Sequence, residues 1–252
     1  MAINTVTVIL TTITDKHLKV LLNKTTDGLW ALPEALIGEN EDMDIAALKL
    51  MEKHAHHLNY FRQLYTLGKA DRSCNERIIT TAYLSLTPEE NLLKETDSSS
   101  CWFTLNKTVK QSVDEHRTSS VQLRNSEHDI LIEYEVTDKS EGNYIKKDSV
   151  LLNDSNSALA GDNIKIVNMA MDELQLHVIS SGLIFNLLPK EFTLKQVQNV
   201  YEIISQKKKD TANFRRDILK MVTPTGKTVI SYNRKAELYR FNPLLQYLKG
   251  DL

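Results

Sequence analysis

The distribution of charge along the chain is the feature that most constrains its fold. The 252 residues carry a net charge of -2, but residues 183–252 hold 13 Lys or Arg against 6 Asp or Glu, a net charge of +7. Residues 1–182 hold the remaining 18 basic and 27 acidic side chains, a net charge of -9. Since domains usually contain about 100–150 residues, a charge break near Gly182 predicts an acidic domain over residues 1–182 and a basic domain over residues 183–252.

Composition narrows the class of protein. The chain is 41% hydrophobic and 25% charged, with 8 Gly and 5 Pro, which is typical of a globular protein with a packed core. No apolar stretch approaches the ~20 residues of a membrane helix, and the residues after Met1 lack the basic start of a signal peptide. We therefore expect a cytoplasmic protein, in which Cys74 and Cys101 stay reduced and form no CxxC pair.

The first 182 residues have the periodicities of a mixed α and β domain. Residues 5–11 and 17–22 are rich in β-branched and aliphatic side chains and flank a turn, so they predict two adjacent strands. Apolar residues at helical spacing predict a helix over residues 44–58 and another over residues 162–176, capped by Asp162. Further strands are predicted over residues 60–67, 77–86, 129–136 and 149–152. The polar stretch 97–157 is interpreted as an inserted β-hairpin with loose flanks, turning at Gly142-Asn143.

One segment resembles the Nudix hydrolase family. Leu29-Trp30-Ala31-Leu32-Pro33 is followed by Gly38 and an acidic helix, in the order of the family's box G-x5-E-x7-R-E-U-x-E-E-x-G-U, where U is aliphatic. The last glutamates of that box lie on one helical face and hold Mg²⁺ against a diphosphate. The resemblance implies a Nudix-like α/β/α sandwich with a mixed sheet.

The box is degenerate at the positions that bind the metal in that family. Aligned from Gly38, the first acidic position is Asp44, and the Arg-Glu pair becomes Glu52-Lys53. The Glu-Glu pair becomes His56-His57, and the closing Gly becomes Asn59. We therefore expect no catalytic residue, no metal and no cofactor at this box.

Two residue types in this region have more than one interpretation. His54, His56 and His57 are dense enough for a transition-metal site. On a helix, however, His56 would point about 100° away from either adjacent position, which favours surface or half-buried histidines. Trp30 fits a core position as well as a ligand-stacking one.

Residues 183–252 predict a winged helix-turn-helix domain. Thr193 and Gln196 form a capping box that predicts a helix starting at Thr193, and this helix is expected to stop in the run Lys207-Lys208-Lys209. Asp210 is a second predicted cap, for a helix over residues 211–221. The wing is predicted from four consecutive segments: a turn at 224–227, a strand over 228–232, a basic turn and a returning strand over 237–241.

The side-chain types on these elements suit DNA. Arg can pair bidentately with guanine and Asn with adenine in the major groove, while cations of a wing contact phosphates. A helical appendage with a solvated basic face is the alternative, but the order of caps, helices and hairpin favours DNA. The predicted DNA-contacting residues are Lys195, Asn213, Arg215, Arg216, Lys220, Lys227, Arg234 and Lys235.

Four segments resemble the Nudix-related transcriptional regulators of the NrtR family. They are Phe185-Asn186-Leu187-Leu188-Pro189, Phe192-Thr193-Leu194, Asn213-Phe214-Arg215-Arg216 and Leu238-Tyr239-Arg240-Phe241. The resemblance implies a dimeric repressor that joins a Nudix-like effector domain to a winged helix, with ADP-ribose or a pentose as effector. It also implies recognition-helix contacts by Arg215 and Arg216 and wing contacts by Arg234 and Lys235.

The leading hypothesis is a homodimeric repressor that binds a double-stranded DNA operator and senses a nucleotide sugar or a sugar. Trp30, Glu34 and Arg77 are the candidate effector contacts. Glu34-Ala35 replaces the family's Gly-Gly after Leu-Pro, which crowds the loop and leaves a non-nucleotide effector open. The alternative is a Nudix-type hydrolase of a nucleoside diphosphate derivative, with metal ligands outside the box and an appended nucleic-acid-binding module. A third interpretation is an adaptor without a ligand.

Overall fold

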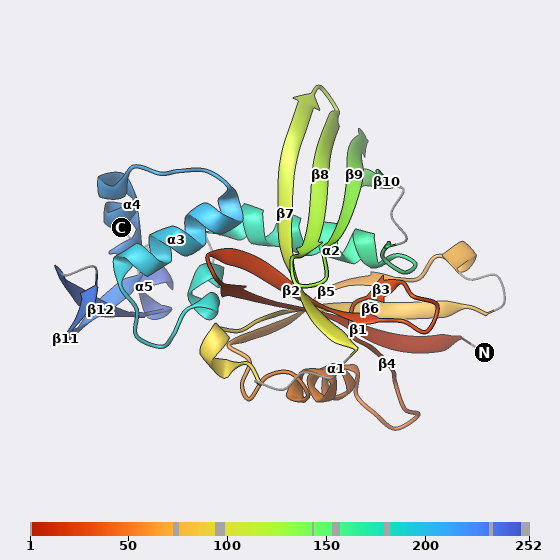
Figure 1. Ribbon diagram of the computed structural model, residues 1–252, viewed down its shortest axis with the longest axis horizontal. Helices are drawn as coiled ribbons and strands as arrows, with labels where there is room; N and C mark the ends of the chain where they lie inside the picture. Colours follow the sequence, from red (N-terminus) through yellow and green to blue (C-terminus); the bar gives the residue numbers. More distant parts are fainter. Residues whose placement is uncertain are drawn as a thin grey trace.

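The structure is a computed structural model that describes residues 2–72, 76–93, 99–142, 144–152, 157–178, 182–231 and 234–247. Most of the N-terminal part is one mixed sheet in the order β10-β9-β8-β7-β2-β1-β6-β5, with β3 paired to β2 and β4 paired to β1. Two helices, α1 and α2, cover this sheet, and the C-terminal elements lie together at one end of the molecule (Figure 1). This is the α+β architecture that the sequence predicts, with a Nudix-like sandwich followed by a winged helix.

The central strands are buried on both faces. β1 (Ile3–Thr14) and β2 (His17–Lys24) form the predicted antiparallel pair, and β1 also runs parallel to β6 (Ile78–Leu86). Because successive side chains of a strand point to opposite faces, Ile9 packs in the core under α2 (Asn163–His177), whereas Val8 and Leu10 pack on the side of α1 (Met43–Glu52). Short strands β3 (Trp30–Ala31) and β4 (Glu34–Leu36) flank this pair, and β5 (Tyr60–Leu67) forms the edge next to β6.

The first helix is shorter than predicted. It ends at Glu52 instead of continuing to residue 58, because the chain beyond it pairs with the segment after β6. The Ala55 backbone forms a bridge with Leu92, and the His56 amide donates to the Asn91 carbonyl at 2.8 Å. His54, His56 and His57 therefore lie beyond the helix, and the helical geometry on which their interpretation rested is wrong.

The interpretation of residues 97–157 as a hairpin with loose flanks is also wrong. The region contains four long antiparallel strands, β7 (Ser100–Val113), β8 (His116–Asn125), β9 (Ile130–Glu141) and β10 (Tyr144–Leu151). They continue the main sheet through the pairing of β7 with β2 and rise away from it in Figure 1. The polar composition hid them because only one face of these strands is buried. Gly142 turns between β9 and β10 at φ +63°, while Asn143 lies outside the described residues.

Short helices and loops connect these strands. Three 3-10 helices, η1 (Ala70–Arg72), η2 (Glu89–Asn91) and η3 (Leu183–Leu187), complete the connections. Asp162 precedes α2 as predicted, but its carboxylate does not cap the helix. It accepts a hydrogen bond from Arg72 Nε at 2.6 Å and pairs with Lys165 at 2.5 Å. Cys101 is a half-buried free thiol, and Cys74 lies outside the described residues.

The C-terminal elements follow the predicted order with two changes. α3 (Leu194–Ser205) and α4 (Thr211–Ile218) are followed by β11 (Val222–Ser231), β12 (Arg234–Phe241) and α5 (Leu244–Tyr247). α4 ends at Ile218 rather than at residue 221. The predicted turn at residues 224–227 is instead a bulge within one long strand, where the register to β12 shifts between Pro224 and Thr228. None of the described helices is long and apolar enough to cross a membrane.

Candidate nucleic-acid interface

Side-chain caps fix the start of α3 and α4. Thr193 Oγ1 accepts a hydrogen bond from the Gln196 backbone N–H at 3.2 Å, and Gln196 Oε1 accepts one from the Thr193 backbone N–H at 2.8 Å. These two bonds confirm the predicted capping box. Asp210 Oδ1 accepts from the Asn213 amide at 2.9 Å, as predicted for the second cap. Such caps are each worth about 0.5–2 kcal/mol, so the sequence itself sets where the two helices begin.

The packing of α4 decides which of its side chains are exposed. Phe214 and Ile218 are buried, and the Phe214 ring lies 5.4 Å from the ring of Tyr201 on α3. Because neighbours three and four apart share one face of a helix, this packing turns the opposite face outward. Asn213, Arg215 and Arg216 on α4 are exposed, and so is Lys220, two residues beyond the end of the helix.

A buried amide that the sequence did not single out holds the two helices together. Gln198 on α3 donates from Nε2 to the Lys209 carbonyl at 3.0 Å and to Thr211 Oγ1 at 3.4 Å. It is buried, and it therefore fixes the link that sets the angle between α3 and α4. No sequence pattern distinguishes this glutamine from an exposed one on the same helix.

The wing is a β-hairpin that is held in place by the segment just before α3. β11 and β12 pair up to Ser231↔Arg234, and the Phe192 backbone forms a bridge with Tyr239, with amide-to-carbonyl distances of 3.0 and 2.8 Å. Glu191, next to Phe192, accepts from Lys227 Nζ at 3.1 Å and from the Arg240 guanidinium. The hydrogen bonds from Arg240 and Lys227 hold the pKa of Glu191 below its usual range.

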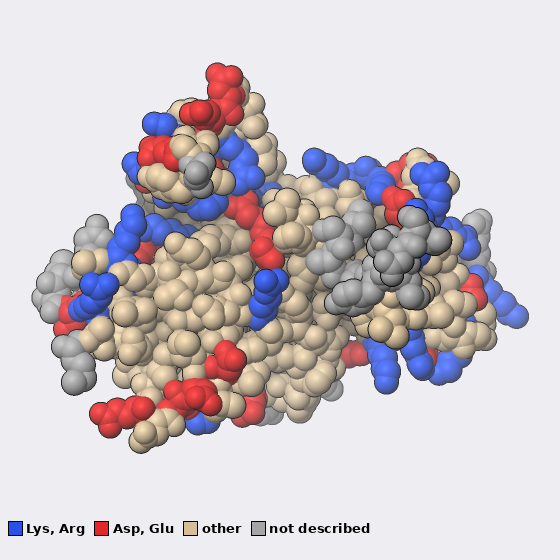
Figure 2. Space-filling model, turned by 180° about the vertical axis from the view of Figure 1, so that it is seen from behind, with Lys and Arg blue, Asp and Glu red and all other residues tan. Residues whose placement is uncertain are grey.

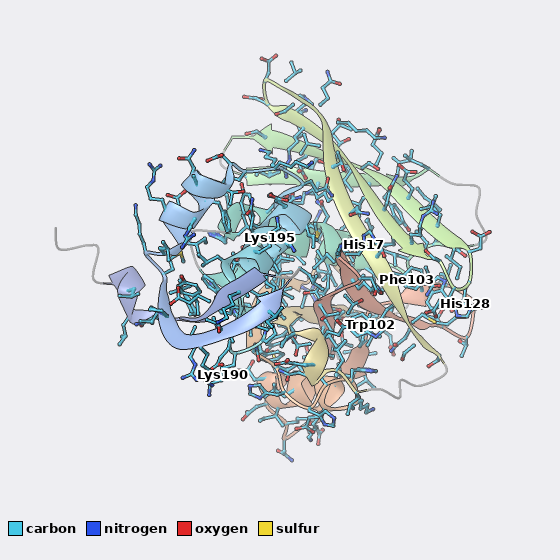
Figure 3. All side chains as sticks on the ribbon, turned by 60° about the vertical axis from the view of Figure 1, so that its left-hand side comes forward. His17, Trp102, Phe103, His128, Lys190 and Lys195 are labelled. Atoms are coloured by element: carbon cyan, nitrogen blue, oxygen red, sulfur yellow. The ribbon has the colours of Figure 1, made fainter. Side chains whose placement is uncertain are left out.

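The predicted contact residues are spread over one basic unit. Lys195 is exposed in the first turn of α3, and Lys235 is exposed on β12, whereas the side chain of Arg234 lies outside the described residues. In Figure 2 the Lys and Arg side chains gather on the C-terminal part, and acidic side chains lie along the opposite end, over the loop before α1. Figure 3 shows Lys195 and Lys190 above and below the wing strands.

The residues of the degenerate Nudix box do not come together as a metal site. Asp44, in the first turn of α1, accepts a hydrogen bond from the Tyr83 hydroxyl at 2.5 Å, so its carboxylate anchors the helix to the sheet. Burial, followed by this hydrogen bond, raises the pKa of Tyr83. Glu52 is the exposed last residue of the helix, and His56 and His57 are exposed beyond it. The described residues contain no group of three or more His, Cys, Asp or Glu that could hold a metal ion.

These positions do not fit the Mg²⁺ site of a Nudix enzyme. Gly38 donates its amide to Glu41 Oε2 at 3.2 Å, which closes the loop before α1. The carboxylate pair that ligates the metal in that family is replaced by imidazoles that are not on the helix, and hard cations prefer oxygen ligands.

The three candidate effector residues lie in different settings. Trp30 is 4% exposed, and its ring packs edge-on against Phe103 at 4.8 Å, so it occupies a core position. Glu34 is exposed on β4, and Arg77 is exposed before β6, where it donates to the Gly68 carbonyl at 3.2 Å. The pocket beside β5 and the pocket between β10 and α2 are both lined by other residues.

Comparison with known proteins identifies the C-terminal unit. Residues 184–241 match the model of the NrtR DNA-binding winged helix domain. The chain is NrtR-like.

Two solved structures and one curated protein extend this similarity along the chain. Shewanella oneidensis NrtR in complex with a 27mer DNA is 23% identical, with a TM-score of 0.68, and the match covers 96% of this chain and 95% of that one. A MutT/nudix family protein from Enterococcus faecalis is 20% identical, with a TM-score of 0.70 and coverage of 96% and 88%. The ADPR responsive transcriptional repressor NtrR of Acinetobacter baylyi is 26% identical over 234 residues, which is 89% of this chain and 76% of the relative.

In this NrtR-like chain, α2 is tied to the winged helix through one glutamine. Gln175 Nε2 donates to the Lys107 carbonyl on β7 at 3.2 Å and to the Ile204 carbonyl near the end of α3 at 3.1 Å. Thr108, next along β7, donates to Gln206 just after α3 at 2.7 Å. A shift of α2 or β7 would therefore reach the helix that supports α4.

One turn before Gln175, a cluster of ion pairs connects α2 directly to β7, β8 and β10 and, through these, to β9. Asp172 pairs with Lys107 of β7 at 2.5 Å, Lys147 of β10 at 2.8 Å and Arg117 of β8 at 2.9 Å. Asp138 of β9 pairs with Arg117 and, at 3.0 Å, with Lys147. Burial raises the pKa of Asp172, but the hydrogen bonds from Lys107 and Lys147 outweigh it, so the net direction is down. The sequence analysis missed this cluster because its members are far apart along the chain.

Proposed function

We propose that the protein is a transcriptional repressor whose residues 183–252 bind an operator and whose residues 1–182 bind a small effector. The match of residues 184–241 to the NrtR DNA-binding winged helix domain carries this proposal. The exposed face of α4 supports it, since Asn213, Arg215 and Arg216 are side chains that read base edges in a major groove. Lys195, Lys220, Lys227, Arg234 and Lys235 supply phosphate contacts.

The proposed effector is ADP-ribose or a related nucleotide sugar. The curated relative from Acinetobacter baylyi is described as ADPR responsive, and it matches 89% of this chain. Among the candidate contacts, Glu34 and Arg77 are exposed and accessible to a ligand, whereas Trp30 is buried in the core. We place the effector in the Nudix-like part of the chain.

The proposed active form is a homodimer. Helix-turn-helix proteins bind two half-sites about one DNA turn apart, so a two-fold operator matches a two-fold protein. Effector binding that changes the spacing of the two winged helices then changes operator affinity. The structure does not favour the hydrolase alternative. The Asp44 carboxylate accepts a hydrogen bond from Tyr83, and His56 and His57 lie beyond the end of α1.

Fluorescence anisotropy with DNA from the promoter regions around its own gene tests this proposal. The titration is run at two salt concentrations, with a scrambled duplex as control, and repeated with ADP-ribose and with a panel of pentoses. We expect salt-dependent binding that prefers the operator and is relieved by ADP-ribose. Equal affinity for operator and scrambled DNA would refute the repressor, and relief by a pentose alone would replace ADP-ribose as the effector.

A further inference from the structure

The main sheet ends in two edge strands that differ in regularity. β5 carries a bulge between Gln63 and Tyr65, whereas β10 pairs with β9 in one unbroken register from Tyr144 to Leu151. Among the described residues β10 pairs with no other strand, and it lies at the free edge of the four strands β7 to β10 (Figure 1). Bulges turn an edge away from further pairing, so the long regular edge of β10 is the one that can accept another strand.

β10 also exposes apolar side chains. Tyr144, Ile145 and Val150 are 58%, 59% and 64% exposed. A regular edge strand with exposed apolar side chains is a site of pairing with another chain. The charged residues between these side chains indicate which chain fits.

Contacts with α2 assign the two faces of β10. Lys147 pairs with Asp172 of α2, so Lys147 and the residues two positions from it lie on the α2 face. The opposite face carries, in order, Tyr144, Lys146, Asp148 and Val150. The charged pair in the middle of this face is exposed, with 3.6 Å between ammonium and carboxylate.

This face of β10 is complementary to itself. When β10 runs antiparallel to β10 of a second copy with Lys147 at the two-fold axis, Lys146 of each copy lies opposite Asp148 of the other. The same register places Tyr144 opposite Val150, and aromatic side chains opposite β-branched ones stabilise sheets. Moving the axis to Lys146 or to Asp148 would put like charges opposite each other.

The neighbours of the two lysines agree with this register. Within the chain, Lys146 lies opposite Lys139 of β9. Like charges directly opposite are destabilising, so a carboxylate on the free side of Lys146 offsets this repulsion. The two Lys147 side chains that meet at the axis lie on the α2 face, where each is bonded to Asp138 at 3.0 Å and to Asp172 at 2.8 Å. Their charges are therefore compensated within each copy.

We propose that the β10 strands of two copies pair antiparallel around Lys147 and join the two main sheets into one. This interface rests on the homodimer of the proposed function and names the surface that forms it. α2 connects the interface to the DNA-binding part, because Asp172 contacts β10 and Gln175, three residues later, contacts the end of α3. The paired strands therefore restrain the separation of the two winged helices.

Sedimentation velocity of the full-length protein over a range of concentrations, at low salt, tests the register by exchanging charges. Lys146→Asp leaves two acidic side chains on this face of the strand, and Asp148→Lys leaves two basic ones, so each single variant sets like charges opposite each other. We expect the dissociation constant of the dimer to rise at least about 10-fold in each. The double variant Lys146→Asp/Asp148→Lys restores both ion pairs with reversed sign and should return to the wild-type value.

A mixture of the two single variants gives a second test, which a loss of folding cannot imitate. One variant carries only acidic and the other only basic side chains at the two positions, so both ion pairs form between them. We expect a heterodimer at concentrations where each variant alone is a monomer. Arg62→Asp, on the other edge strand β5, is the matched control and should leave dimerisation unchanged.

The inference is overturned if the single variants dimerise as tightly as wild type, if the double variant stays as weak as the single ones, or if the mixture forms no heterodimer. A wild-type dimer with any of these results keeps the homodimer of the proposed function and places its interface elsewhere. A wild-type protein that is monomeric at all concentrations overturns both. Operator binding is measured separately, so dimerisation through β10 without operator preference would refute the repressor alone.

Discussion

At the scale of single residues, the cations of the C-terminal unit are not equivalent. Arg215 lies beside the Tyr239 hydroxyl, which donates to Glu237, and Lys227 is engaged by Glu191. Arg216 interacts with the neighbouring Asp217 only through charge, and Lys235 has no ion pair among the described residues; both are exposed. The cations that are least engaged in the unbound protein are therefore those expected to contribute most to DNA binding.

Arg216→Ala tests base recognition. If the guanidinium pairs with a base, we expect a loss of about 1–3 kcal/mol in affinity for the operator and a smaller loss for random DNA. Anisotropy titrations on operator and scrambled duplexes measure the difference. Equal losses on both duplexes would assign Arg216 to the phosphate backbone instead.

Lys235→Ala tests phosphate contact by the wing. Binding should weaken evenly across sequences, and the slope of log affinity against log salt should fall by about 1, because one fewer counterion is released. Lys227→Ala is the matched control. Its ammonium is already paired with Glu191, so the slope should change less. A larger change for Lys227 than for Lys235 would contradict this ranking.

Asp172→Asn tests the charge cluster. Removing this carboxylate leaves three cations against one, which should lower the free energy of unfolding by about 3–5 kcal/mol at pH 7. The pKa of Asp172 is lowered in the folded state. Its contribution is therefore complete above the unfolded pKa of about 3.9 and is lost as pH falls through the folded pKa.

Urea denaturation at a series of pH values checks this expectation. The stability of wild-type protein and of Asp172→Asn should converge as pH falls below about 4, because the wild-type carboxyl is then protonated. Glu173→Gln is the control, since the Glu173 carboxylate has only distant partners, Arg62 at 3.9 Å and His177 at 3.8 Å. A constant difference between wild type and Asp172→Asn down to low pH would show that the loss is steric rather than electrostatic.

At the scale of elements, local signals located the helices of the C-terminal unit well. The capping box at Thr193 and the cap at Asp210 depend on residues at most three positions apart, so a sequence displays them in full. The strand β5 was also located from local sequence, and its observed bounds equal the predicted ones. The end of α1 was missed because it is set by pairing with Leu92, which is distant in sequence.

Thr193→Ala tests the cap of α3. The Gln196 amide loses its acceptor, and we expect the free energy of unfolding to fall by about 1 kcal/mol. Thr193→Ser keeps the hydroxyl and should recover most of the loss. Chemical denaturation followed by circular dichroism compares the three proteins, and equal stability of the Ala and Ser variants would argue against the cap.

At the scale of the whole molecule, Gln175 is one of the residues through which the Nudix-like part contacts the winged helix. It joins α2 to β7 and to the end of α3. If effector binding is transmitted through this junction, Gln175→Leu should reduce the ratio of operator affinities without and with ADP-ribose by at least about 3-fold, within the usual range of coupling free energies. Operator affinity without ADP-ribose should change little.

The control for this measurement is Gln111→Leu, an equivalent change at an exposed position of β7. Its affinity ratio should equal that of wild type. Loss of operator binding in Gln175→Leu even without ADP-ribose would show that Gln175 supports the winged helix itself. An unchanged ratio would place the transmission elsewhere, with the Thr108 to Gln206 hydrogen bond as the next candidate.

The sequence by itself determined the parts of this protein that rest on short-range order. The acidic and basic halves, the two capped helices with their exposed arginines, and the paired strands β1 and β2 all follow from charge and from periodicity within a few residues. Only the tertiary structure decided which residues meet across long separations. Lys107, Asp138 and Asp172 come together because four strands with one buried face place alternate side chains against α2, and no local pattern records that register.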